Sequence, residues 1–294
     1  MTNAPLWIDE PELPVEAAIA ALRDALRTPA ENPPRQIVPV RNGQLLLMPA
    51  ELPGAYAGVK LVTIAPDNPA VGLPRIAGVY VLFDGVTLQP VALLDAARLT
   101  AIRTAAVSAL AVDALAPADA SRLVIFGAGP QAYAHLDAIA AIRPIRQVHI
   151  IGRTPASANT LRERVTALGF TTDTGLRTAD IVACCTTARE PLFDSAELPD
   201  EATVVAVGSH EPDARELDAD LVRRATVVVE SRASAATAGD IVMAGTVDEI
   251  VAGELADLVA GRVQIAEGRP RVFKSVGEAW EDLAVGAAIV RDRS

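Results

Sequence analysis

Residues 122–132, RLVIFGAGPQA, decide the fold of this 294-residue chain. An apolar run at 123–126 ends in GAGPQA, which fits G-x-G-x-x-G/A, and a helical pattern follows. The first glycine of such a turn permits the bend, the second admits a pyrophosphate, and the small last residue lets helix pack on strand. A glycine-rich loop without a nucleotide is the alternative. The context favours a dinucleotide site, with cofactor contacts from Gly127, Gly129, Pro130 and Gln131.

The pattern of a parallel sheet continues on the C-terminal side of this turn. Four further apolar runs, at 147–151, 180–187, 202–209 and 225–230, have the length and composition of buried strands, and a helical pattern separates the first two. Buried runs that alternate with helices indicate a parallel sheet covered on both faces. We therefore expect residues 117–270 to form an α/β domain of the doubly wound Rossmann type.

The N-terminal side has a different organisation. Residues 14–27 have the apolar spacing of an amphipathic helix, which a Pro-rich link at 28–35 ends. Short apolar runs broken by Gly and Pro follow, and an Ala-rich helical pattern covers 95–115. The runs predict strands of an antiparallel or mixed sheet at 44–49, 58–64, 77–83 and 90–95.

Composition and charge exclude several classes of protein. Hydrophobic residues make up 51% and charged residues 21%, which is typical of a globular protein. A net charge of −11 repels polyanions, so we expect neither nucleic acid nor an anionic membrane as a partner. We expect neither a signal peptide nor a membrane span, because the N-terminal stretch is acidic and broken by Pro and no long uncharged apolar run follows. Adjacent Cys184 and Cys185 have neither disulfide nor metal-ligand spacing, which predicts a cytoplasmic protein without a metal site.

The end of the second strand bears on the choice of cofactor. Many NAD enzymes carry a carboxylate there for the ribose hydroxyls, but Gly152-Arg153-Thr154 follows Ile151 here. A guanidinium suits a 2′-phosphate, so NADPH is favoured, with NADH possible. Arg153 could also be a solvated loop residue. Thr186, after the strand at 180–185, is expected to line the cofactor site, with both cysteines as packing residues.

Three basic residues lie in unusual surroundings. Only two of the 26 basic residues are lysines, and one of them, Lys60, lies inside an apolar strand-like run. Arg103 lies in an apolar helix, and Arg35 follows two prolines. Each could be a surface residue with a packed stem. Together they could offer guanidinium groups to a carboxylate and an ammonium for proton transfer, and burial with basic neighbours should lower the pKa of Lys60.

An ordered set of motifs along nearly the whole chain resembles the ornithine cyclodeaminase/mu-crystallin family. The motifs are Arg35, MPA at 48–50, GVK at 58–60, Pro66 with Asn68, GLP at 72–74, LTAIRTAAVSALA at 99–111, GAGPQAYAH at 127–135, ELD at 216–218, GDI at 239–241 and FKSVG at 273–277.

This resemblance implies a Rossmann domain at 117–270, inserted into a smaller α+β substrate and dimerisation domain formed by 1–116 and 271–294. It implies that Arg35, Lys60 and Arg103 surround a substrate carboxylate, with Lys60 near the reacting nitrogen, and that the protein is a homodimer. The further cofactor contacts that we expect are Thr104, Thr154, Val207, Ser275 and Gly277.

The loop at 208–217, GSHEPDAREL, bears on the reaction. Ornithine cyclodeaminases carry an essential Asp where this chain has His210, so cyclodeamination is disfavoured. The loop is similar to that of mu-crystallin and of the pyrroline- and piperideine-2-carboxylate reductases, which indicates NAD(P)H-dependent reduction of a cyclic imine to proline or pipecolate. An alanine dehydrogenase and a non-catalytic small-molecule-binding protein are the alternatives. His210 could contact substrate or only cap the loop.

Overall fold

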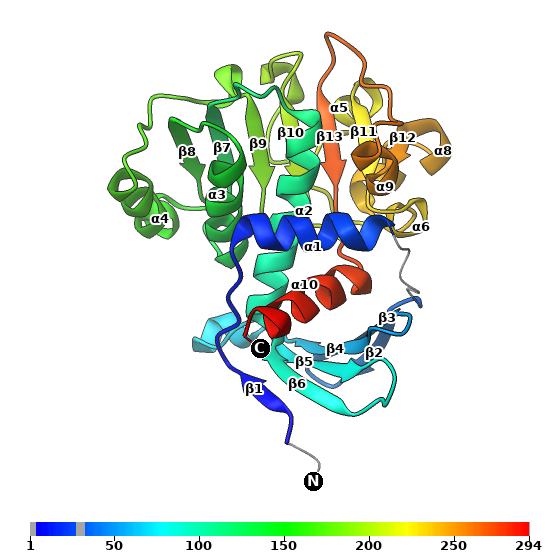
Figure 1. The fold of residues 1–294 in the computed structure, drawn as a ribbon. Helices are drawn as coiled ribbons and strands as arrows, with labels where there is room; N and C mark the ends of the chain where they lie inside the picture. The colour runs from blue at the N-terminus through cyan, green and yellow to red at the C-terminus, as the bar shows by residue number, and fades with distance from the viewer. Residues whose placement is uncertain (1–3, 28–32, 294) are drawn as a thin grey trace. The chain divides into compact units, whose positions relative to one another are not determined.

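The computed structural model describes residues 4–27 and 33–293, so part of the expected Pro-rich link lies outside the described residues. The chain divides into two compact units. Unit 1 contains Met1–Ala106 and Glu278–Ser294, and unit 2 contains Val107–Gly277. Unit 2 is thus inserted into unit 1 along the sequence, in an α/β fold of the class that the sequence indicates (Figure 1).

The limits of the units differ from the domain limits proposed from the sequence. The first falls inside α2 (Ala96–Leu115) and not after it. The second falls after β13 (Arg271–Lys274), because this strand pairs with β10 and β11 of unit 2. Residues 271–277, which we placed with the first domain, therefore lie in unit 2. The functional domains 1–116 plus 271–294 and 117–270 stay a prediction.

Unit 2 contains a seven-stranded sheet in which every pair of neighbours is parallel. Its order is β12-β11-β13-β10-β9-β7-β8. The chain moves outward from β7 to β8 and returns to β9 on the other side of β7, so a topological switch lies at β7, where α/β proteins bind ligands. The strands are β7 (Arg122–Phe126), β8 (Gln147–Ile151), β9 (Ile181–Cys184), β10 (Thr203–Ala206), β11 (Thr226–Val229), β12 (Val251–Glu254) and β13.

Helices and short helical turns connect these strands. The predicted helices after the glycine-rich turn and after β8 are present, and Thr154 caps the second with its side chain. The elements are α3 (Pro130–Ile142), α4 (Pro155–Ala167), α5 (Ala219–Arg224), α6 (Arg232–Ala235), α7 (Gly239–Val242), α8 (Val247–Ile250), α9 (Leu255–Val259) and the 3₁₀ turns Leu176–Thr178 and Ser195–Glu197.

Unit 1 is built on a six-stranded sheet in the order β1-β6-β5-β4-β3-β2. All neighbours are antiparallel except β1 and β6, so the sheet is mixed. The four strands predicted from the apolar runs are confirmed, and β1 and β2 are additional. The bounds are β1 (Leu6–Ile8), β2 (Gln36–Val40), β3 (Gly43–Leu52), β4 (Tyr56–Ile64), β5 (Ile76–Asp84), β6 (Pro90–Asp95) and a 3₁₀ turn at Asn68–Val71.

One face of this sheet is covered by helix. Figure 1 draws α10 (Ala279–Asp292) in red across β3, β4 and β5, and α1 (Val15–Arg27) packs on α10. Side chains at alternate positions of the strands are buried on this inner face, in the pattern of a half-covered sheet. Lys60 is one of them, so the fold of unit 1 buries a lysine between sheet and helix.

The outer face of the same sheet is apolar and incompletely covered within the described chain. The strand register places Trp7, Leu93, Val81, Val59 and Pro49 in one row across five strands. Four of them are half-buried, and Trp7 is 57% exposed. A continuous apolar face of this kind is typical of an interaction surface.

Candidate active site

Lys60 lies at the centre of a buried polar cluster in unit 1. The inner face of β4 directs its side chain toward the first turn of α10, where its Nζ donates to Asp282 Oδ2 at 2.7 Å. The hydroxyl of Thr100 on α2 lies 3.5 Å from the same nitrogen. The Lys60 and Asp282 side chains are almost fully inaccessible, so this is a buried ion pair.

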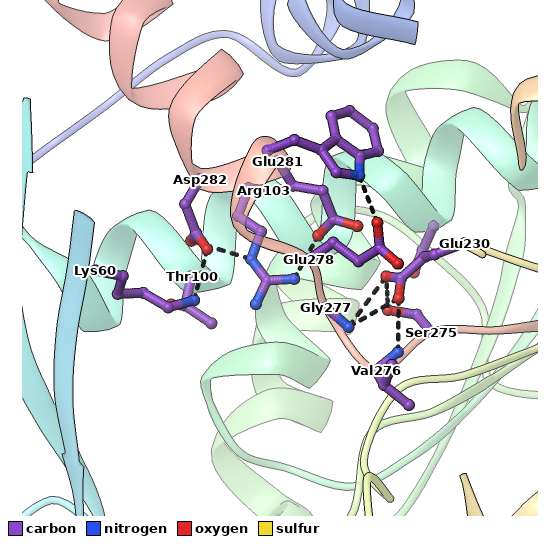
Figure 2. A network of polar contacts seen from close by, with 12 residues as sticks. Lys60, Thr100, Arg103, Glu230, Ser275, Val276, Gly277, Glu278, Glu281 and Asp282 are labelled. Atoms are coloured by element: carbon purple, nitrogen blue, oxygen red, sulfur yellow. Dashed lines mark hydrogen bonds and ion pairs between the residues drawn. The ribbon is translucent and has the colours of Figure 1, made fainter. Parts of the chain in front are cut away.

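Arg103 joins the cluster from α2. Its Nη1 donates to Glu281 Oε2 at 2.6 Å, and its Nε donates to Asp282 Oδ1 at 3.3 Å. Asp282 therefore bridges the lysine and the arginine, as Figure 2 shows. The structure brings together two of the three basic residues that the sequence singled out, and it balances their charge with two buried carboxylates.

The burial and the charges of the cluster change the pKa of Lys60. Burial and, to a smaller extent, the charge of Arg103 lower the pKa of Lys60 to about 8, against the opposing effects of Asp282 and Glu281. The lowering that the sequence predicted from burial and a basic neighbour is confirmed. A lysine with a pKa of about 8 can give and regain a proton near neutral pH, which the ordinary value of 10.5 would not allow.

Glu281 and Asp282 belong to this cluster, and the sequence did not reveal them as site residues. At the start of a helix, acidic residues are usually explained by the helix dipole alone. The rest of the helix carried the signal that could have identified these two carboxylates as buried. Positions 283–287 are all small or apolar, and α10 is buried nearly all round through this stretch. Carboxylates on such a helix need cations, and Lys60 and Arg103 are the cations that meet them.

Arg35, the third basic residue singled out from the sequence, belongs to the same part of the sheet as Lys60. It immediately precedes β2 and is partly exposed. Gln36 pairs with Leu47 and Met48 pairs with Lys60, so the register continues as a row from Arg35 through Met48 to Lys60. Two strand spacings of about 4.8 Å separate the backbones of Arg35 and Lys60. That is within reach of a ligand that contacts both side chains.

Tyr80 is a third residue of this region that the sequence did not reveal. It pairs with Lys60 on β5, and its ring occupies room left by two glycines: a Cβ on Gly58 would lie 2.0 Å from the hydroxyl, and one on Gly286 of α10 would lie 3.4 Å from the ring. The hydroxyl is buried with no hydrogen-bond partner among the described residues. Burial and Asp282 raise the pKa of Tyr80, so the phenol stays neutral beside the cluster.

In unit 2, the glycine-rich turn has the geometry of a phosphate cradle. Gly127 has φ +117°, and a Cβ there would lie 2.4 Å from the Cys185 carbonyl oxygen, so glycine is required. A Cβ on Gly129 would meet no protein atom within 4 Å. Protein packing therefore does not explain this glycine, whereas a pyrophosphate close to the backbone would. Pro130 and Gln131 begin α3, whose N-terminus faces the turn, and the residues present fit a dinucleotide.

The two residues after β8 are placed at the same edge of the sheet. β7 and β8 are neighbours, so Arg153 follows the strand adjacent to the glycine-rich turn. Arg153 is exposed, and Thr154 is the N-cap of α4, where it accepts a hydrogen bond from Ser157 N. An exposed guanidinium beside a helix N-terminus is a suitable site for a phosphate group.

The remaining predicted cofactor residues lie where strands of unit 2 end, with one exception. Thr186 and Val207 follow β9 and β10, and Ser275 and Gly277 follow β13. Thr104 is instead a buried residue of α2 in unit 1. His210, which could contact substrate or only cap its loop, lies partly exposed after β10.

A buried carboxylate anchors the loop that holds two of these residues. Glu230, which follows β11, accepts from Ser275 Oγ at 2.5 Å and from Val276 N at 2.9 Å. It also accepts from Gly277 N at 2.9 and 3.1 Å (Figure 2). This carboxylate fixes a loop whose glycine has φ +78°, so the backbone there is held in one conformation.

The described residues contain neither a metal-binding cluster nor a helix able to span a membrane. No group of three or more His, Cys, Asp or Glu side chains in 4–27 and 33–293 is placed to hold a metal ion. In the same ranges, no helix combines the length and the apolar character that crossing a bilayer would need.

Comparison with known proteins assigns the family. The sequence profile of the ornithine cyclodeaminase/mu-crystallin family matches residues 9–294. A Δ1-pyrroline-2-carboxylate reductase of Bacillus cereus is 34% identical over 289 residues, which cover 92% of this chain and 89% of that protein.

Two solved structures have the same fold. Thermococcus litoralis Δ1-pyrroline-2-carboxylate reductase, in complex with NADH and L-proline, superposes with a TM-score of 0.90 at 30% identity over 98% of this chain and 97% of that one. An archaeal alanine dehydrogenase dimer with bound NAD superposes with a TM-score of 0.91 at 26% identity over 98% and 95%. The chain therefore belongs to the ornithine cyclodeaminase/mu-crystallin family.

Proposed function

We propose that the protein is an NAD(P)H-dependent oxidoreductase that reduces a cyclic imine carboxylate, Δ1-pyrroline-2-carboxylate or Δ1-piperideine-2-carboxylate, to proline or pipecolate. The observation that carries this proposal is the buried Lys60–Asp282 pair, in which the lysine has a pKa of about 8. Relatives named as pyrroline-2-carboxylate reductases, one of them solved with NADH and proline, support the reaction class.

The residues of unit 1 would perform the protein's part of the chemistry. Arg103 and Arg35 would hold the substrate carboxylate, and Lys60 would keep a proton at the imine nitrogen, because a protonated C=N bond is far more electrophilic than a neutral one. NADPH, when bound, would supply a hydride for C2 of the imine. Asp282 would hold the Lys60 ammonium in place and favour its return to the protonated state.

Three other activities are tested by one panel of substrates. An alanine dehydrogenase would oxidise NADPH with pyruvate and ammonia, an ornithine cyclodeaminase would form proline from L-ornithine with catalytic NAD, and a binding protein would turn over none of them. We expect NADPH oxidation with the two cyclic imines, and neither proline nor ammonia from L-ornithine, since His210 replaces the cyclodeaminase Asp. Rapid turnover of ornithine would overturn the proposal.

We propose that Arg153 reads the 2′-phosphate of NADPH, since it follows β8 and is exposed beside the N-terminus of α4. Arg153→Ala should weaken NADPH binding by about 1.5–3 kcal/mol, the loss of a charge-assisted contact, and spare NADH. Titration calorimetry with both cofactors measures this difference. Arg177→Ala, on the surface of the same unit, is the control. Equal losses for both cofactors would show that Arg153 has another role.

We propose a homodimer that covers the apolar outer face of the unit 1 sheet. The row from Trp7 to Pro49 offers a second copy of the chain a continuous apolar surface. Light scattering at micromolar concentration should give the mass of a dimer. Val81→Glu, at the centre of the row, should shift it toward the monomer, since a charge would be buried there without a partner. A monomeric wild-type protein would contradict this proposal.

A further inference from the structure

The second of the two lysines is also buried against an aspartate. Lys274 ends β13, and its Nζ lies 2.9 Å from Asp240 Oδ2 on α7. Both side chains are almost fully inaccessible. Lys274 has no place in the mechanism above, and a buried ion pair is weak evidence of stabilisation, since a well-packed apolar pair often stabilises as well.

The ion pair is part of a closed network around Glu216. The Glu216 Oε1 atom accepts from Thr186 N at 2.8 Å and from Thr186 Oγ1 at 2.7 Å, and Oε2 accepts from Gly208 N at 2.8 Å. Asp240 Oδ1 accepts from the backbone N–H groups of Glu216 and Leu217, at 2.7 and 2.9 Å. Asp240 thus fixes the backbone of Glu216 and pairs with Lys274, while Glu216 holds two loops by its side chain.

These two loops lie beside the phosphate cradle. Thr186 follows β9 and Gly208 follows β10, and both strands end at the edge of the sheet that carries the glycine-rich turn. A Cβ on Gly208 would lie 1.8 Å from the Thr186 carbonyl oxygen, so the two loops are in close contact. The Cys185 carbonyl oxygen, one residue before Thr186, packs against Gly127. A shift of either loop would therefore reach the cradle.

We propose that Glu216 is a positioning residue for the dinucleotide: its carboxylate clamps the loops after β9 and β10 in the binding arrangement, and protonation of this carboxylate releases the clamp and weakens cofactor binding. The backbone N–H groups of Thr186 and Gly208 can only donate, one to each carboxylate oxygen, so both oxygens of Glu216 are acceptors in this arrangement. If Oε2 carried a proton directed at Gly208, its O–H would face the Gly208 N–H, and two donors cannot form a hydrogen bond with each other. The inference rests on the proposed use of NAD(P)H.

The groups that face Glu216 set the pH at which this happens. Burial raises the pKa of Glu216 to about 7, against the opposing effects of Lys274 and of the donors on Thr186 and Gly208. The thiols of Cys184 and Cys185 also face it, but burial and Glu216 raise their pKa values, so they stay neutral. Asp240 is occupied by Lys274 and the backbone. The clamp should therefore loosen as the pH falls through about 7.

As the pH falls, the free energy of unfolding should rise while the affinity for the cofactor falls. This difference distinguishes a positioning role of Glu216 from a purely structural one. The folded-state pKa of about 7 exceeds the ordinary 4.5, so the folded chain binds the extra proton between these values. The contribution of Glu216 to the free energy of unfolding of the cofactor-free protein should therefore increase as the pH falls from about 7 toward 4.5. A purely structural residue would not weaken cofactor binding while the fold becomes more stable.

The test is the dissociation constant of NADH, measured by calorimetry from about pH 6 to about pH 8.5. NADH is the probe because it lacks the 2′-phosphate, whose own second pKa of about 6 would confuse the profile. We expect wild-type affinity to fall about tenfold toward the acidic end. Glu216→Gln, in which the amide nitrogen cannot accept from Gly208, should bind about tenfold more weakly at the alkaline end and show little pH dependence.

Two further variants complete the design. Glu197→Gln, on the exposed surface of unit 2, should behave as the wild type. Lys274→Met removes the cation that lowers the pKa of Glu216, so the midpoint of the binding profile should move to higher pH. If the NADH affinity of the wild type did not change with pH, the inference would be overturned, even if Glu216→Gln failed to fold. It would also be overturned if the ratio of the two proteins' dissociation constants were the same at every pH. A wild type that binds neither NADH nor NADPH would overturn the proposed function as well.

Discussion

Lys60→Met is expected to lower kcat by about 10²-fold or more while NADPH affinity stays unchanged, because it removes the proposed proton donor. Met fills much of the volume of the lysine stem, so the inner face of β4 should keep its packing. Steady-state kinetics with Δ1-pyrroline-2-carboxylate, with cofactor binding measured separately, gives both quantities. A variant with near-normal kcat and a raised KM would show that Lys60 anchors the carboxylate and that the proton comes from elsewhere.

The pH profile provides a control for this assignment. An acid must be protonated to act, so kcat/KM should decline as the pH rises above the Lys60 pKa of about 8. Asp282→Asn removes the anion that raises this pKa, so its alkaline limb should move to lower pH. An unmoved limb would mean that another group titrates there. Glu281→Gln is the graded comparison, because Glu281 also raises the pKa of Lys60 but less than Asp282 does, so the alkaline limb should move in the same direction by a smaller amount.

Arg103→Leu is expected to lower the free energy of unfolding by about 3 kcal/mol or more and to raise KM for the imine. The loss of stability follows from the two buried carboxylates, Glu281 and Asp282, which would lose the guanidinium that they share. The rise in KM follows if Arg103 also holds the substrate carboxylate, in ground and transition states alike. Urea unfolding and steady-state kinetics measure the two effects.

Arg103→Lys is the control that separates the effect of the positive charge from the effect of the guanidinium geometry. Lysine keeps one positive charge but cannot present the planar fork that reaches both carboxylates, so an intermediate loss of stability is expected. An Arg103→Leu protein as stable as the wild type would show that the carboxylates are compensated by other groups. Unchanged KM in that variant would remove Arg103 from the substrate site.

The sequence predicted most of the fold because its strong patterns are local. The stretch 122–132 and the alternation after it identified the Rossmann unit, and the apolar runs before it gave four strands of the first sheet. The place of β13 was not predictable in this way. It inserts between β10 and β11 although it is the last strand of the chain, and neighbours in a parallel sheet need not be neighbours in sequence. The helices α5 to α9 are too short to give a period.

The sequence predicted the basic residues of the site but not the acidic residues that pair with them. Lys60 and Arg103 were visible because a cation in an apolar run is unusual, whereas their partners looked like ordinary acidic residues in the first turn of a helix. The network of Glu216, Asp240 and Lys274 was visible only as three motifs of unstated purpose. Each contributes one charge from a different element, and only the folded chain brings these charges together.

In the function that we propose, hydride is transferred to the carbon of a cyclic imine. The most direct test uses NADPH deuterated at the transferable hydrogen, with Δ1-pyrroline-2-carboxylate as the acceptor and NMR of the product. We expect proline with deuterium at Cα, in an amount equal to the NADPH oxidised. Oxidation of NADPH with pyruvate and ammonia but not with the imine, or proline without deuterium, would contradict the account.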